Sequence, residues 1–130
     1  MRCTIKLILA LIVFAPILVQ AGLSTKGYVK ITENRTRATM RATMNVRHNA
    51  DAPGSPYVQV YGSPGGSITI SGRDDKLSFA CNVLTSSPNY EEAVSLKNNF
   101  KNGSDLYVVR RTNSTNCESF TLTNRSYYMD

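Results

Sequence analysis

The sequence predicts a small, mainly β protein with a single α-helix between its late strands. Beyond its apolar start, most of the chain alternates between apolar and polar side chains, which is the period-two pattern of half-buried strands. Glycine-containing turns such as "GSPGGS" from Gly62 separate these segments. One later stretch, "SPNYEEAVSLKNNFKNG" from Ser87 to Gly103, instead has the apolar spacing and the end residues of a helix.

The first 21 residues are expected to form a secretory signal peptide. Arg2 and Lys6 precede an apolar run from Leu7 to Val19, and the small residue Ala21 suits a cleavage site. The alternative is a membrane anchor, but a membrane-spanning helix needs about 20 apolar residues, more than this run provides. We therefore expect no membrane insertion, secretion into the periplasm and then out of the cell, and one domain formed by residues 22–130.

The charge of the secreted part argues against nucleic acid as a partner. Removal of Arg2 and Lys6 lowers the 15 basic residues to 13, against 9 acidic residues. This excess is small and scattered along the chain, whereas nucleic-acid-binding domains concentrate basic residues on one face.

Cys81 and Cys117 are the two cysteines that remain after removal of the signal peptide. An even number of cysteines in an oxidising compartment favours a disulfide, and we expect these two to bond to each other. The chain-entropy model gives such a long loop a stabilisation of about 4 kcal/mol. The alternative is a metal site, but His48 is the single histidine and the cysteines lack zinc-binding spacing. We expect neither a metal nor a cofactor.

The alternating segments predict the strands in order. "MRATMNVR" from Met40 places its apolar side chains on one face and its arginines on the other. "YVQVYG" and "SITIS" follow on either side of the "GSPGGS" turn, which is a hairpin signal. "KLSFACNV" places Leu77, Phe79, Cys81 and Val83 on one face. We expect strands at 40–47, 57–62, 67–71, 76–83, 106–111 and 119–123, and a short extra strand at 27–32.

The expected helix has a defined start and a broad apolar face. Ser87 or Asn89 suits the N-cap, and Gly103 suits the C-terminal stop. Ala93, Leu96 and Phe100 form one apolar stripe, and Tyr90 and Val94 widen it to an arc of about 160°. Either the whole arc belongs to the core, or part of it packs against a neighbouring subunit.

Three strands, a helix and two further strands is the element order of the five-stranded OB-fold barrel, in which the helix connects strands three and four. In this assignment the residues from Tyr57 to Val83 supply the second and third barrel strands. A β-sandwich is the alternative, although a lone amphipathic helix between late strands is less expected there.

"SPY" from Ser55 and "FACNVLTSSPNYEEAVSLKNNFKNGSDLYVVR" from Phe79 resemble the B subunits of bacterial A–B toxins that carry five B subunits, in the branch of subtilase cytotoxin and typhoid toxin. The shared pattern is a strand ending in Ala-Cys, a Pro-x-aromatic loop, a helix, a glycine and a strand. The resemblance covers roughly Met40 to Thr123. It implies a homopentamer that binds host cell-surface glycans, often sialylated, and delivers a catalytic A subunit.

The resemblance also implies roles for particular residues. The family's helices line a central pore, and Tyr90 and Val94 would then contact the neighbouring subunit. The family's sugar site lies near the start of the first barrel strand. The corresponding sugar-site residues here are Thr36, Arg37, Thr39 and Arg41, with Ser55 and Tyr57 close by. The residues facing the pore would be Glu91, Ser95, Asn98 and Asn99.

The chemistry of these residues suits a sugar. Threonine and serine hydroxyls bond sugar hydroxyls, an arginine holds a sialic acid carboxylate by two hydrogen bonds, and Tyr57 offers a ring to an apolar sugar face. The alternative is that Arg37 and Arg41 are ordinary solvated strand residues.

The sequence departs from the family at two places. Gln59 stands where the family has a cysteine, so a disulfide from Cys81 must go to Cys117. The family's aromatic Tyr-Tyr-Ser segment is replaced by "ENRTRAT" from Glu33, which implies a different sugar preference or a lost site.

No nucleophile and base are arranged for catalysis, so we expect no enzymatic activity. The leading prediction is a lectin-like toxin B subunit. The alternatives are a monomeric periplasmic OB-fold that binds a small ligand or peptide, and a secreted inhibitor or adhesion protein.

Overall fold

The computed structural model describes residues 27–44, 54–101 and 103–124. The expected signal peptide, His48 and the end of the expected strand 40–47 lie outside these ranges. The described elements follow in the order β1 (Val29–Glu33), β2 (Arg37–Thr43), β3 (Tyr57–Gly62), β4 (Ile68–Arg73), β5 (Ser78–Val83), α1 (Tyr90–Asn99), β6 (Ser104–Arg111) and β7 (Cys117–Asn124).

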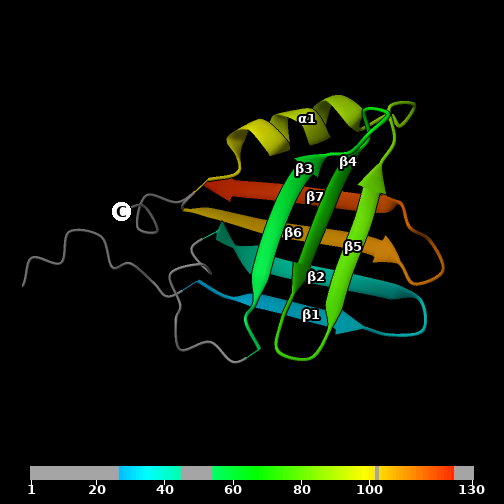
Figure 1. Cartoon of the computed structure of the whole chain (residues 1–130). Coiled ribbons are helices and arrows are strands. Elements are labelled where there is room, and N and C mark those ends of the chain that lie inside the picture. Colours follow the sequence, from blue (N-terminus) through cyan, green and yellow to red (C-terminus); the bar gives the residue numbers. More distant parts are fainter. Residues whose placement is uncertain (1–26, 45–53, 102, 125–130) are drawn as a thin grey trace, which may run out of the picture.

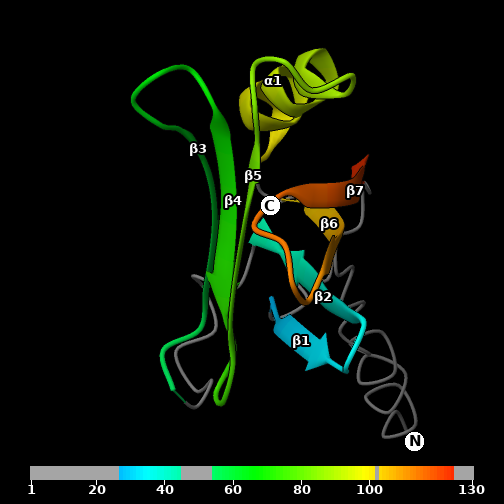
Figure 2. The same cartoon turned by 90° about the vertical axis from the view of Figure 1, so that its right-hand side faces the viewer.

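The strands form two antiparallel sheets, which confirms the mainly β fold with one helix. One sheet has the order β1-β2-β6-β7 and the other the order β3-β4-β5. The sheets lie face to face with their strands crossing steeply, and α1 lies across one end of the layers (Figures 1 and 2). The described strands do not close into a five-stranded barrel. The helix follows β5 rather than a third strand, because β1 is a strand of its own and β3 and β4 are two arms of one hairpin.

One corner joins the two sheets. The N–H of Asn82, at the end of β5, donates to the carbonyl of Thr115 at 2.8 Å, and Asn82 and Asn116 form a parallel bridge. Cys81 and Cys117 form the predicted disulfide beside this bridge, with an S–S distance of 1.98 Å.

The alternating side chains fill the space between the sheets as the sequence predicts. Met40 and Ala42 of β2 are fully buried, and so are Leu106 and Val108 of β6. From the other sheet, the buried apolar side chains are Val58, Ile68, Ile70, Phe79, Cys81 and Val83.

Burial does not alternate strictly in every strand: five consecutive residues of β4, Ile68 to Gly72, are buried, and so are Ser104 to Leu106 of β6. Gly72 lies against the Met40 sulfur, where a Cβ atom would collide with it, so the glycine lets the sheets approach closely. Leu77, predicted to share the buried face of Phe79, is 37% exposed. The reason is that β5 begins only at Ser78, and Leu77 belongs to the turn that precedes it.

The helix buries the predicted stripe. Ala93 and Leu96 are buried, and Phe100 packs partly against the core. Tyr90 and Val94 also pack partly against the core, and the Tyr90 hydroxyl donates to the Gly66 carbonyl in the β3–β4 turn at 2.6 Å. Most of the wide apolar arc therefore packs against the chain's own core.

Both ends of the helix differ in detail from the predicted caps. Asn89 is the N-cap residue, but its side chain makes no capping hydrogen bond and instead accepts one from the Ser87 hydroxyl. The helix ends at Asn99, before the expected Gly103 stop, because Phe100 turns to an extended conformation.

Asp74 ties the turn between β4 and β5 to the edge strand of the other sheet. Its Oδ1 accepts the backbone N–H groups of Lys76 and Leu77 at 2.8 and 2.6 Å, and its Oδ2 accepts that of Ile31 at 3.0 Å. Burial acts to raise the pKa of Asp74, but these backbone hydrogen bonds and the charge of Lys76 outweigh it, so the pKa lies below its ordinary value of 3.8.

The Asp74 carboxylate should therefore make stability depend on pH. A lowered pKa in the folded state stabilises the protein above the unfolded pKa, and this stabilisation is lost as the pH falls through the folded pKa. We expect Asp74→Asn to lower the free energy of unfolding at neutral pH by about 1 kcal/mol. In urea denaturation, the wild type and the variant should converge below pH 3.8, the ordinary pKa of the group. The matched control is Asp75→Asn at the exposed neighbour, and identical curves for both variants would contradict the assignment.

Candidate functional site

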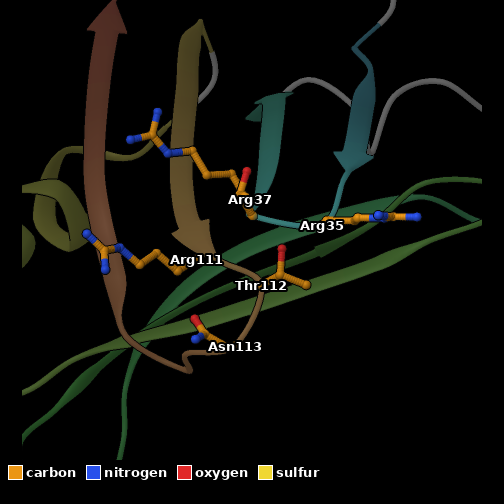
Figure 3. A pocket seen from close by; sticks show the side chains of 6 residues that line it. Arg35, Arg37, Arg111, Thr112 and Asn113 are labelled. Carbon is orange, nitrogen blue, oxygen red and sulfur yellow. The ribbon is translucent and has the colours of Figure 1, made fainter.

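Two turns from distant parts of the sequence meet at one end of the four-stranded sheet. One joins β1 to β2 and the other joins β6 to β7. Between them lies a surface hollow of about 560 Å³, which we call the arginine hollow (Figure 3). Its lining residues are Arg35, Thr36, Arg37, Arg111, Thr112 and Asn113.

Hydrogen bonds hold the two turns in place. The Asn34 Oδ1 accepts the backbone N–H groups of Thr36 and Arg37 at 2.9 and 2.8 Å, and also the Thr36 hydroxyl at 2.9 Å. The Thr112 N–H donates to the Thr36 carbonyl at 3.1 Å, and the Thr112 hydroxyl donates to the Asn34 carbonyl at 2.8 Å. The backbones of the two turns that carry the lining residues are thus fixed relative to one another.

Arg37 and Arg111 give the hollow its positive charge. They are directly opposite each other in the β2–β6 ladder, where like charges repel. Their guanidinium groups extend to the same side, whereas Arg35 extends to the other (Figure 3). The Arg37 guanidinium is 3.5 Å from the Glu118 carboxylate, a long and partly exposed ion pair of small energetic value. Among the residues that the structure describes, no acidic side chain lines the hollow, so the Arg37–Glu118 pair beside it offsets only part of its positive charge.

A second hollow of about 570 Å³, the tyrosine hollow, adjoins the first. The two share Thr112 and Asn113 in their linings. Tyr57, at the start of β3, lines the tyrosine hollow and is 43% exposed, so its ring is available to a ligand. The remaining lining residues are Ser71, Ser78, Phe79, Ala80, Arg110, Ser114 and Thr115.

The Arg110 side chain holds the β6–β7 turn, which lies between the two hollows. Its guanidinium lies 5.4 Å from the centre of the Phe79 ring, a cation–π contact. The same group donates to the carbonyls of Arg111, Thr112 and Ser114 at 3.3 to 3.4 Å. The turn that carries Thr112 and Asn113 is therefore anchored to the buried aromatic ring of the other sheet.

The structure brings some of the predicted sugar-site residues together and separates others. Thr36 and Arg37 line the arginine hollow, and Tyr57 lines the adjoining tyrosine hollow. Thr39 is half-buried in β2, and its hydroxyl is hydrogen-bonded to that of Thr32. Ser55 is exposed, with a φ of 51°, and lines neither hollow. The last of the predicted residues, Arg41, lies further along β2 and pairs with a buried carboxylate there.

Arg111, Thr112, Asn113 and Arg110 were not among the predicted site residues. The motif "RRTN" from Arg110 is present in the sequence, but it has no special meaning on its own. Only the pairing of β2 with β6 places Arg111 opposite Arg37.

The predicted oligomer helix carries an exposed polar face. Glu91, Ser95 and Asn98 are exposed, while Tyr90 and Val94 are half-buried against the core of this chain. The exposed Asn99 completes this face, and its amide donates to the Ser95 carbonyl at 2.7 Å.

Across residues 27–44, 54–101 and 103–124, no group of three or more His, Cys, Asp or Glu side chains is placed to hold a metal ion. In the same ranges, no helix is both long enough and apolar enough to cross a membrane.

The chain matches no protein-family model, and no significant similarity to a curated protein or to a solved structure is found.

Proposed function

We propose that this protein binds acidic glycans through the arginine hollow, as the B subunit of a secreted toxin that carries a catalytic A subunit to host cells. One observation carries the proposal: Arg37 and Arg111 face each other in a hollow that no acidic side chain of the described part of the chain lines. Like charges held directly opposite each other destabilise the sheet, so an anionic ligand that neutralises them binds favourably.

One sialylated glycan can occupy both adjoining hollows at once. The carboxylate of a sialic acid would be held by the guanidinium groups of Arg37 and Arg111. The hydroxyls of Thr36 and Thr112 would bond the sugar hydroxyls, and the Tyr57 ring would pack against an apolar sugar face in the second hollow. The chain itself would perform no catalysis and would need no cofactor.

The oligomer belongs to the same proposal. A single shallow and open site of this kind binds weakly, and a ring of identical subunits would raise its avidity. The proposed ring is a homopentamer of subunits related to the OB-fold, in which Glu91, Ser95 and Asn98 would face a central pore. Light scattering should then give about five times the chain mass. A monomer would favour the alternative of a periplasmic binding module that uses the same hollow.

Loss of the facing arginines should abolish acidic-glycan binding. We expect the single variant Arg111→Gln to weaken the affinity for sialyllactose about 10-fold, because it removes a charge-assisted hydrogen bond. The double variant with Arg37→Gln should lose binding further, while lactose, which lacks the carboxylate, should bind poorly to all forms. Calorimetric titration of the intact protein measures these affinities.

The matched control is Lys97→Gln, which removes the same charge from the exposed side of α1. It should leave sialyllactose binding unchanged. Equal affinities of the wild type and the double arginine variant would refute this site, and absence of binding to any sialylated glycan would refute the lectin function.

A further inference from the structure

β3 is an edge strand of the three-stranded sheet and lacks the features that usually protect such an edge. Among the described residues it pairs with β4 alone, in an unbroken register from Tyr57 to Gly62. It contains no charged residue, no proline and no β-bulge, which are the devices that keep exposed edges from pairing with another strand. The sheet diverges from the four-stranded sheet toward β3, so a strand added there continues away from the other layer (Figure 2).

Each of the other three edge strands has some protection. β1 carries the exposed charges of Lys30 and Glu33. Near the end of β5, the Asn82 N–H already donates to the segment that precedes β7. β7 carries the exposed Glu118 beside the irregularity in its pairing with β6. In the described part of the chain, β3 is therefore the edge at which pairing with another strand is least opposed.

The β3–β4 ladder shows which backbone groups of β3 point outward. The Ser63 N–H donates to the Ser67 carbonyl at 2.7 Å, and these two residues continue the register of the ladder. Hydrogen-bonded and non-hydrogen-bonded pairs alternate along an antiparallel ladder. Val58, Val60 and Gly62 therefore belong to the non-hydrogen-bonded pairs, and their N–H and C=O groups point away from β4.

The sequence of β3 is complementary to itself. "YVQVY" from Tyr57 to Tyr61 reads the same in both directions. When two copies pair antiparallel about Gln59, each tyrosine lies opposite a tyrosine, each valine opposite a valine, and Gln59 opposite its own copy. In this register the valines exchange the backbone hydrogen bonds, and theirs are the groups that point outward.

The side chains of β3 suit the same pairing on both faces of the sheet. On the outer face, Tyr57 and Tyr61 are 43% and 44% exposed, and cross-strand aromatic pairs stabilise a sheet. On the inner face, Val58 is buried and Val60 is half-buried at the rim of the core. A valine of a second copy opposite Val60 would cover it.

We propose that a second copy of this chain pairs with β3 through its own β3, so that the two three-stranded sheets become one continuous antiparallel sheet with a two-fold axis at Gln59. The second copy then places its Tyr61 beside Tyr57, and so adds an aromatic ring to the rim of the tyrosine hollow. A single strand from each copy makes a smaller interface than a stable dimer needs, so this association is reversible. It uses neither the polar face of α1 nor the arginine hollow, and it would join two rings or two single chains.

Cysteine cross-linking tests the register. In the proposed pairing the two Gln59 Cα atoms are about 4.5 Å apart, within the range of a disulfide. Because Cys81 and Cys117 are bonded to each other, Gln59→Cys adds a free thiol, and mild oxidation should give a disulfide-linked pair of chains on non-reducing electrophoresis. Tyr57→Cys and Tyr61→Cys are the matched controls. Alone, neither should cross-link, since its copy lies four residues along the partner strand, about 13 Å away.

An equimolar mixture of Tyr57→Cys and Tyr61→Cys should cross-link, because this register places these two positions opposite each other. If the mixture stays unlinked, or if Tyr57→Cys alone cross-links as readily as Gln59→Cys, the proposed pairing is overturned.

Light scattering over a concentration series tests the association without any cysteine. The mass of the wild type should rise toward twice its dilute value, with a dissociation constant of about 0.1 mM. Gln59→Lys should prevent this rise, since it places two like charges opposite each other on the edge. Ser78→Lys adds the same charge to the exposed start of β5 and should associate as the wild type does.

A wild-type mass that is constant at all concentrations, or an unchanged rise for Gln59→Lys, would show that a second copy does not occupy this edge. The dilute mass tests the ring separately: a single chain that still doubles in mass contradicts the ring and supports this pairing, and a ring that never doubles contradicts this pairing alone.

Discussion

Replacing Cys81 and Cys117 together by alanine is expected to lower the free energy of unfolding by about 4 kcal/mol. The disulfide closes a loop with a sequence separation of 36 residues, so its removal greatly increases the entropy of the unfolded chain. For a domain with a total stability of about 5–15 kcal/mol, this loss removes between about a quarter and four fifths of the stability. Urea denaturation of the oxidised wild type and the double variant measures the difference.

The wild type treated with a reducing agent should show the same loss as the double variant. Reduction should have no further effect on the variant itself, since its bond is already absent. A variant with the denaturation midpoint of the oxidised wild type would show that the core holds the sheets without the disulfide.

The position of the disulfide explains why its loss should matter beyond chain entropy. In the described residues the two sheets do not continue into each other as a barrel would, and the bridge between Asn82 and Asn116 is their one strand-to-strand link. The disulfide lies next to that link and next to the turn that carries Thr112 and Asn113. We therefore expect its removal to loosen the arginine and tyrosine hollows together with the sheet corner.

Local patterns predicted the elements of this fold well. The alternation through Met40 and Ala42 identified a buried strand face, and the spacing of Ala93 and Leu96 identified the buried face of the helix. The even pair of cysteines identified the disulfide. These features are local or compositional, so a single sequence carries them in full.

The arrangement of the elements was less predictable, because it depends on pairing between distant segments. The alternation in Arg37–Thr43 gives its two faces but not the neighbours of β2, which are β1 and β6. The arginine hollow exists only because that pairing places Arg111 opposite Arg37.

Phe79 should contribute both to the stability of the core and to the shape of the arginine and tyrosine hollows. Its side chain lies between the sheets and is 2% exposed, and its ring makes a cation–π contact with the guanidinium of Arg110. We expect Phe79→Ala to lower the free energy of unfolding by about 3–5 kcal/mol, through lost burial and the cavity left behind. Arg110 would also lose the ring that positions it beneath the turn carrying Thr112 and Asn113.

Phe79→Leu is the control that separates the two effects, because leucine fills much of the space but offers no aromatic face. We expect it to lose less stability than Phe79→Ala and still to weaken sialyllactose binding, since Arg110 is no longer held over a ring. Denaturation gives the stability of both variants, and calorimetric titration gives their affinity under conditions where each is folded. If Phe79→Leu binds sialyllactose as tightly as the wild type, the hydrogen bonds from Arg110 to the turn carbonyls are sufficient to hold the site, and the ring serves the core alone.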